Sequence, residues 1–187
     1  NFPEALNHYW EALKMFETLA DYRLVALVYK DIATTHLFGH NYPKAIEVCQ
    51  DALRIFRMKN QAGQAIGNAV DTMRLYSGLG FCLRNTGKSD SALRIYLHYL
   101  EIGKEQHFEL TDMLVHYGIV SYCYMETGKH DSALFYLRKS LTFPEINPSI
   151  QALKMEHRRR IGMTYHFFQN EDSAKYYLEL AYEWFSS

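Results

Sequence analysis

The sequence has little of what a disulfide-stabilised fold requires. Its 187 residues include only three cysteines, Cys49, Cys82 and Cys123, and an odd number of widely spaced thiols argues against a disulfide framework. We therefore expect reduced, buried thiols, which favour a cytoplasmic setting over a periplasmic one. A periplasmic domain with few cysteines would have the same composition, so composition does not decide the compartment.

An excess of charge of either sign is also lacking. The 20 Lys and Arg residues and 21 Asp and Glu residues give a formal net charge of −1. A nucleic-acid-binding domain usually has a basic stripe and a high isoelectric point, so we expect no nucleic acid as a partner of this region. No run of about 18 apolar residues occurs, so we expect no membrane span in it either.

The common catalytic motifs are absent from the sequence. It contains no glycine-rich phosphate loop, no H-E-x-x-H segment and no G-x-S-x-G segment. The segment HLFGH places His36 and His40 four residues apart, which suits two ligands on one helix face, but no further metal ligands lie near them. We therefore predict a protein that is not an enzyme, with no catalytic residue, no metal and no cofactor.

What the sequence does contain is a short segment that recurs. It reads GKSDSAL at 87–93, GKHDSAL at 128–134 and NEDSAK at 170–175, which places Ala92, Ala133 and Ala174 41 residues apart. Related segments upstream contain Ala45 and Ala5, at separations of 47 and 40 residues. A period of about 40 residues is typical of stacked helical repeats.

Each of these alanines lies in an amphipathic helical pattern, as at Ala133, Leu137 and Leu141. A second helical stretch precedes each one and ends in a polar turn. At those turns Gly87 and Gly128 suit a helix end with positive φ, and Asp131 suits the cap of the next helix. No stretch alternates with period two, so we predict helix–turn–helix units and no strands.

A second set of small residues lies twelve positions before the alanines, at Ala33, Gly80, Ser121 and Gly162. Tyrosines precede three of them by four residues, at Tyr29, Tyr76 and Tyr117, and Arg158 takes that place in the last unit. This pattern resembles the tetratricopeptide repeat, W-x₂-L-G-x₂-Y followed by A-x₃-F. The resemblance implies an all-α fold, a right-handed α-α superhelical solenoid of antiparallel helix pairs.

The resemblance covers nearly the whole chain, and we expect one continuous domain over residues 1–187. Its expected parts are the second helix of a partial repeat at about 1–19 and helix pairs at about 21–59, 61–104, 106–143 and 148–187. The period exceeds the usual 34 residues of the family. Lengthened repeats of this kind resemble those of bacterial regulatory and sensor proteins, and we expect the chain to be a fragment of a longer protein.

In tetratricopeptide proteins the first helix of each pair lines a concave groove, and the resemblance implies a site there. The first-helix positions that we do not expect to be part of the core are Lys30, Thr34, Phe38, Arg74, Phe81, Arg84, Asn85, Tyr122, Met125, Glu126, Arg159, Met163 and His166. Apolar side chains that can anchor a peptide, mixed with charged side chains that can orient it, suit a peptide-binding surface. We predict a non-catalytic module that binds a protein or peptide, as the sensor or interaction region of a larger bacterial signalling or transcription-regulating protein.

Two alternatives stay open at this point. The basic segment HRRR at 157–160 is either a solvated helix face or, through Arg159, a contact for a carboxylate or another anion. The apolar last helix, residues 177–185, has more apolar surface than one neighbouring helix covers. A structural scaffold or self-association module, with a homodimer through this C-terminal helix, is therefore the alternative function.

Overall fold

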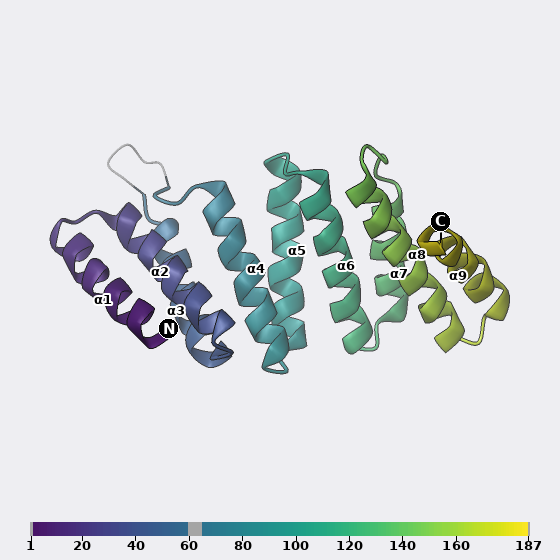
Figure 1. Ribbon diagram of the computed structural model, residues 1–187, viewed down its shortest axis with the longest axis horizontal. Helices are drawn as coiled ribbons and strands as arrows, with labels where there is room; N and C mark the ends of the chain where they lie inside the picture. The colour runs from purple at the N-terminus through teal and green to yellow at the C-terminus, as the bar shows by residue number, and fades with distance from the viewer. Residues whose placement is uncertain (1, 60–64, 187) are drawn as a thin grey trace. The chain divides into compact units, whose positions relative to one another are not determined.

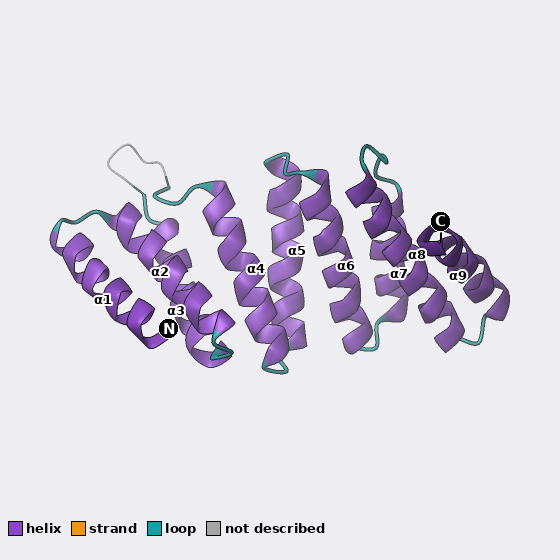
Figure 2. Cartoon of the chain, in the orientation of Figure 1, coloured by secondary structure: helices purple, strands orange, loops and turns teal. Residues whose placement is uncertain are grey.

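The computed structural model describes residues 2–59 and 65–186 of the chain, and within these ranges every regular element is a helix (Figure 2). The helices are α1 (Phe2–Thr18), α2 (Tyr22–Phe38), α3 (Tyr42–Phe56), α4 (Ala69–Asn85), α5 (Ser89–Glu105), α6 (Leu110–Glu126), α7 (His130–Leu141), α8 (Pro148–Phe167) and α9 (Glu171–Ser186). The prediction of an all-α fold is confirmed for the described residues. Residues 60–64, which include the predicted start of the pair at 61–104, lie outside them.

The chain divides into two compact units, with the boundary inside α5. Unit 1 extends as far as Ile95, and unit 2 begins at Tyr96. In unit 1, α1 to α4 pack in sequence and α2 also contacts α4. In unit 2, α6 to α9 pack in sequence and α6 also contacts α8. Successive helices run antiparallel, so the first helices of neighbouring pairs lie side by side within each unit (Figure 1).

The recurring alanines hold the two helices of each pair close together. Ala45, Ala92, Ala133 and Ala174 are each at most 2% exposed. A small residue on the facing helix has the same role at Gly162, where an added Cβ would lie 2.7 Å from the Leu178 side chain. The small residues are therefore required by close packing, because a larger side chain would push the two backbones apart.

The turns inside the helix pairs share one backbone conformation. Gly87 has a φ of +75° and Gly128 a φ of +72°, as predicted for helix ends of this type. The equivalent positions, five residues before the packing alanine, are His40 with a φ of 57° and Gln169 with a φ of 58°. The left-handed turn thus belongs to the repeat, and two pairs adopt it without glycine.

One local prediction is wrong. Asp131 does not cap α7, because the helix begins at His130 and its N-cap residue is Lys129, which makes no side-chain cap hydrogen bond. Asp131 lies inside the first turn, where its negative charge complements the helix dipole. The side-chain caps with hydrogen bonds are found elsewhere, for example at Asn147, whose Oδ1 accepts from the Ile150 amide of α8 at 2.9 Å.

The three cysteines lie in the helical core, as expected. Cys49, Cys82 and Cys123 are buried and free, so none forms a disulfide. Burial raises the pKa of Cys49 to about 12 and that of Cys82 to about 11. These two thiols are therefore packing groups rather than activated nucleophiles. Among the described helices, none is long and apolar enough to cross a membrane.

Candidate functional site

The first helices of the pairs carry all thirteen residues predicted to form the binding site. We call the exposed surface of α2 and α4 in unit 1 the α2–α4 face; it holds Lys30, Thr34, Phe38, Arg74, Phe81, Arg84 and Asn85. We call that of α6 and α8 in unit 2 the α6–α8 face; it holds Tyr122, Met125, Glu126, Arg159, Met163 and His166. Each face lies within one unit, and each has its own chemistry.

Charged side chains connect the two helices of the α2–α4 face. Lys30 Nζ lies 3.1 Å from Asp71 Oδ1, and Arg74 Nη1 lies 3.6 Å from the same oxygen. Asn68 Nδ2 donates to the other carboxylate oxygen of Asp71 at 2.7 Å. Burial alone would raise the pKa of Asp71, but the hydrogen bonds from Asn68 and Lys30 lower it below its ordinary value. The carboxylate is therefore ionised and holds both cations beside the groove between α2 and α4.

A depression of about 240 Å³ lies beside this network. Lys30, Thr34 and Arg74 line its polar part, and Leu37 lines its apolar part. Gly78 also lines the depression, and a Cβ there would lie 3.5 Å from Leu37, in ordinary van der Waals contact. The depression thus offers a small apolar pocket whose edge carries two cations paired with the carboxylates of Asp31 and Asp71, a combination that suits an apolar side chain next to a polar group.

The far end of the α2–α4 face is aromatic. Phe81 makes an edge-to-face contact with Tyr42 at a centroid distance of 6.1 Å, and the guanidinium of Arg84 lies 5.8 Å from the Phe81 ring centroid. Asn85 Nδ2 donates to the Phe81 carbonyl at 2.9 Å. Phe38 is 65% exposed. This end of the face therefore presents two exposed aromatic rings, Phe38 and Phe81, with a guanidinium beside Phe81.

On the α6–α8 face, Arg159 is held in place from two sides. Its Nε and Nη2 donate to the Glu156 carboxylate at 2.7 and 2.8 Å, and its Nη1 lies 3.0 Å from Met163 Sδ. Arg160 also donates to Glu156, at 2.9 Å, and to the Gly118 carbonyl of α6 at 3.2 Å. The hydrogen bond from Arg159, with that from Arg160, outweighs burial and lowers the pKa of Glu156 to about 2.

The rest of the α6–α8 face is largely apolar. Tyr122 is 40% exposed and Met163 is 53% exposed. Met125 is half-buried, and its sulfur lies 3.5 Å from the Thr164 hydroxyl of α8. Val115, seven residues before Tyr122, is exposed on α6 as well. The face therefore presents an apolar strip beside one positioned arginine.

Two of the predicted residues lie at the edge of this face. His166 Nδ1 lies 3.0 Å from Glu171 Oε1, so this side chain is directed towards the turn into α9. Glu126 is exposed in the last turn of α6.

The sequence interpretation missed three residues that shape these faces. Asp71 and Glu156 orient the cations. The pairing of Asp71 with Lys30 joins two helices and is not visible in the sequence. Arg159 and Arg160 follow Glu156 by three and four residues, a helical spacing that could have revealed that pairing. Val115 could have been found, because its spacing of seven residues from Tyr122 keeps it on the same side of α6.

The histidines at 36 and 40 do not form a paired site. His40 Nδ1 lies 2.8 Å from the Tyr42 hydroxyl, in the turn between α2 and α3. His36 is half-buried on α2, and burial lowers its pKa below the ordinary value. Within the described parts of the chain, no three His, Cys, Asp or Glu side chains are grouped so that they could hold a metal ion.

Comparison with known proteins identifies the repeat. Residues 117–147, which include most of α6 and all of α7, match the family model of the tetratricopeptide repeat. This segment includes Tyr117, Ser121 and Ala133, three of the positions on which the resemblance in the sequence rests. No curated protein sequence matches the chain.

Solved structures with low sequence identity have the same fold. TPR-like repeats from a Podosopora anserina protein described as a kinesin light chain superpose with a TM-score of 0.75 at 12% identity, over 97% of this chain and 86% of theirs. BtubC from P. vanneervenii gives 0.71 at 16% identity, over 97% and 72%. A Rap protein complexed with Competence and Sporulation Factor gives 0.63 at 14% identity, over 95% and 58%. The chain is thus an all-α repeat solenoid of antiparallel helix pairs, as predicted.

Proposed function

This chain carries a tetratricopeptide repeat and folds as a solenoid of such helix pairs, and we propose that it is a non-catalytic module that binds a protein or peptide on the exposed faces of its first helices. Proteins with this fold typically act as interaction scaffolds, which supports the class of function. The proposal for the surface rests on the side chains of the α2–α4 and α6–α8 faces.

One observation carries this proposal: on the α6–α8 face a positioned arginine lies directly beside exposed apolar side chains. Arg159 contacts Met163, and Tyr122 lies on the neighbouring helix of the same face. Apolar groups supply most of the free energy of binding, and a guanidinium in a fixed position orients a carboxylate or carbonyl of the partner. An extended or helical peptide with apolar side chains and at least one acidic group fits this chemistry.

We also propose that this module is the sensor or interaction region of a larger bacterial signalling or transcription-regulating protein. The likeness to a Rap protein in complex with a factor supports a role of this kind. The neighbouring coding sequence tests it: a kinase or DNA-binding domain in the same polypeptide supports the regulatory role, and a polypeptide of helical repeats alone contradicts it.

Replacement of three first-helix residues tests the binding surface. Peptides that bind the chain are selected from a random displayed library, and their affinities for the chain are measured by calorimetry. We expect the combined variant Arg84→Ala, Tyr122→Ala and Arg159→Ala to lose binding at least about a hundredfold, because alanine at central contact positions costs about 1–2 kcal/mol each.

A matched control removes the same residue types from second helices. Arg54→Ala, Arg94→Ala and Tyr176→Ala change exposed side chains of α3, α5 and α9. This control variant is expected to bind like the original chain. Equal affinity of the first-helix variant, with an unchanged circular dichroism spectrum, would contradict the proposed surface.

A scaffold or self-association role is the second candidate, and the C-terminal helix favours it. Tyr182 of α9 is 74% exposed and Phe185 is 54% exposed. A homodimer through α9 would cover both rings. Light scattering tests this idea: replacement of Tyr182 by Lys would convert such a dimer to a monomer, whereas an unchanged mass would exclude this contact.

A further inference from the structure

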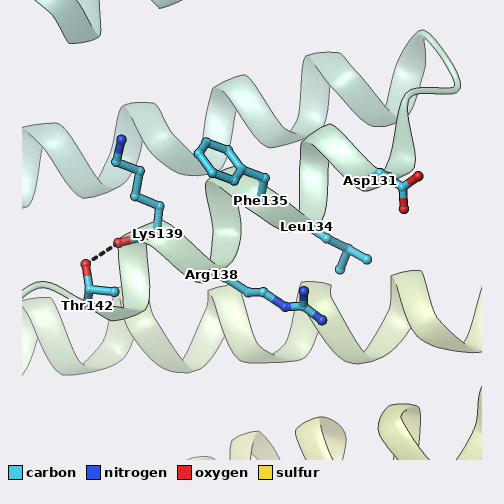
Figure 3. Close-up of a pocket in the computed structure, with 6 residues that line it drawn as sticks. All are labelled: Asp131, Leu134, Phe135, Arg138, Lys139 and Thr142. Atoms are coloured by element: carbon cyan, nitrogen blue, oxygen red, sulfur yellow. Dashed lines mark hydrogen bonds between the residues drawn. The ribbon is translucent and has the colours of Figure 1, made fainter.

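The outer face of α7 is a surface that the proposed function does not use. It consists of Asp131, Leu134, Phe135, Arg138, Lys139 and Thr142, which border a shallow depression of about 470 Å³ (Figure 3). These residues belong to a second helix, whereas the proposed peptide-binding faces belong to first helices. Their spacing of three and four residues places them in one stripe along the helix.

An exposed aromatic ring occupies the middle of this face. Phe135 is 57% exposed, in contrast to Leu134 beside it, which is 6% exposed and packs in the core of unit 2 with Leu137 and Ile161. Phe135 contacts Tyr136 edge to face at 5.3 Å, and the ammonium group of Lys139 lies 5.6 Å from its centroid. The ring is therefore positioned from two sides, and the Leu134 side chain lines the depression next to it.

The charges on this face are arranged with opposite signs at its two ends. Asp131 lies in the first turn of α7, and Arg138 and Lys139 lie in the last turn. The Arg138 guanidinium is held 5.5 Å from the centroid of the Tyr165 ring of α8. In Figure 3, Asp131 lies at the start of the helix and Lys139 at its other end, with Phe135 between them.

The positions of these residues make the face complementary to itself. Asp131 and Lys139 each lie four residues from Phe135, at a distance of about 6 Å along the helix axis. Rotation by 180° about an axis through Phe135 therefore exchanges the position of Asp131 with that of Lys139. The rotation brings Asp131 of one copy opposite Lys139 of the other and places Phe135 beside its counterpart, while Arg138 keeps its contact with Tyr165. Two identical surfaces can therefore meet about a two-fold axis.

We propose that two copies of this chain associate through the outer faces of their α7 helices, packed antiparallel about a two-fold axis near Phe135. The ridge of Asp131, Phe135 and Lys139 from one copy lies in the shallow groove of the other, as in other helix packings. The Phe135 ring of each copy covers the exposed apolar surface of the other. Two ion pairs, each between Asp131 of one copy and Lys139 of the second copy, set the antiparallel register.

The size of this contact determines how it must be measured. One exposed helix face is at the low end of the range of interface areas, which is typical of weak, reversible association. We therefore expect a dimer that forms with rising concentration, and sedimentation equilibrium of the whole 187-residue chain, loaded at several concentrations up to about 1 mM, is the suitable measurement.

Charge reversal tests the register. Asp131→Lys places two lysines opposite each other across the interface, and Lys139→Asp places two aspartates opposite each other. Each variant alone is expected to weaken dimerisation about tenfold or more. A mixture of the two variants in equal amounts should dimerise like the original chain, because every contact in the mixed dimer again joins a lysine and an aspartate. The double variant should also recover the dimer.

Two controls separate this contact from other causes. Circular dichroism of each variant shows whether α7 is intact, and Phe135→Ser, which changes an exposed ring and neither charge, should also give a monomer. Arg94→Ala, at an exposed position of α5, should leave the dimer unchanged. The proposal is overturned if the original chain is a monomer throughout the concentration range, if Phe135→Ser dimerises normally, or if the mixed variants fail to associate.

Discussion

The ring nitrogen Nδ1 of His157 on α8 lies 2.5 Å from the hydroxyl oxygen of Ser140 on α7. Both side chains are enclosed in unit 2, with His157 only 2% exposed and Ser140 fully buried. The imidazole packs against Gly118 of α6, where an added Cβ would lie 2.6 Å from its Nε2. One histidine therefore joins three helices, and it does so in its neutral form, because burial, together with the positive charge of Arg160, lowers its pKa to about 4.

The stability of the chain should therefore fall on mild acidification. Between pH 6.5 and about 4 the unfolded chain binds a proton at His157 and the folded chain does not. The stabilisation that comes from neutral His157 is thus fully present above pH 6.5. It is lost as pH falls, so that the free energy of unfolding is about 3 kcal/mol lower near pH 4. Burial also lowers the pKa of His116, which adds to the effect in the same direction. Urea denaturation at a series of pH values measures it.

A histidine variant identifies the source of this dependence. His157→Gln is expected to be less stable at pH 7, because a fitted ring is lost, but to depend less on pH between 5 and 7. The same substitution at the exposed His98 should leave the stability at pH 7 unchanged. Measurement above pH 5 avoids the titration of Glu156, whose stabilising effect is lost as pH falls from its ordinary pKa of 4.5 to its folded pKa of about 2. An unchanged slope in His157→Gln would contradict the assignment.

Ala133→Leu should destabilise the chain by about 1–3 kcal/mol, because the enlarged side chain has no room between the helices of its pair. Ala133 is 0% exposed. The midpoint of chemical denaturation measures the change. Arg94→Leu introduces the same side chain at an exposed position of α5 and should shift the midpoint little. A midpoint unchanged in Ala133→Leu would show that the register of the repeats is wrong.

The left-handed turns predict a pair of opposite effects. Gln169→Gly should raise the free energy of unfolding by about 0.5–1 kcal/mol, since glycine adopts the observed φ of 58° without steric cost. Gly128→Ala, at the equivalent turn with a φ of +72°, should lower it by about 1 kcal/mol. Nothing within 4 Å would contact the new methyl group, so the effect comes from the backbone alone. Effects of the same sign in both variants would rule out this explanation.

The buried cysteines should resist alkylation in the folded chain. Burial raises the pKa of Cys49 and Cys82, and Cys123 is 0% exposed, so little thiolate is available to a reagent. With iodoacetamide at pH 8, we expect slow modification in buffer and rapid modification of all three thiols in denaturing urea. Mass spectrometry counts the modified sites, and fast labelling of any of them in buffer would show that it is accessible.

Much of the fold could be predicted because its determinants are local and repeated. The alanine spacing located the helix pairs, and a positive φ was predicted correctly at Gly87 and Gly128. His40 and Gln169 adopt the same turn without the residue that usually indicates it, so the chemistry of one turn alone would not have identified them. Asp131 is a common capping residue, but the observed start of α7 leaves it inside the helix.

The surface could be predicted only in part. Helical periodicity selected thirteen first-helix positions, and whether these residues contact a partner stays a prediction. The pairing of charges was not predictable, because Lys30 and Asp71 are 41 residues apart and meet only when α2 packs on α4. By contrast, Arg159 and Arg160 lie three and four residues after Glu156, so helical spacing alone could have indicated these two ion pairs.

The sequence by itself determined that this protein is a stack of helix pairs, because small residues that recur every 40 to 47 residues let successive apolar helix stripes pack against one another. Tertiary packing decided which of the remaining side chains meet water. Phe135 and Leu134 are adjacent and both apolar, yet one is largely exposed and the other is in the core. That difference depends on where α8 and its neighbours lie against α7, and it separates a surface available to a partner from one already covered.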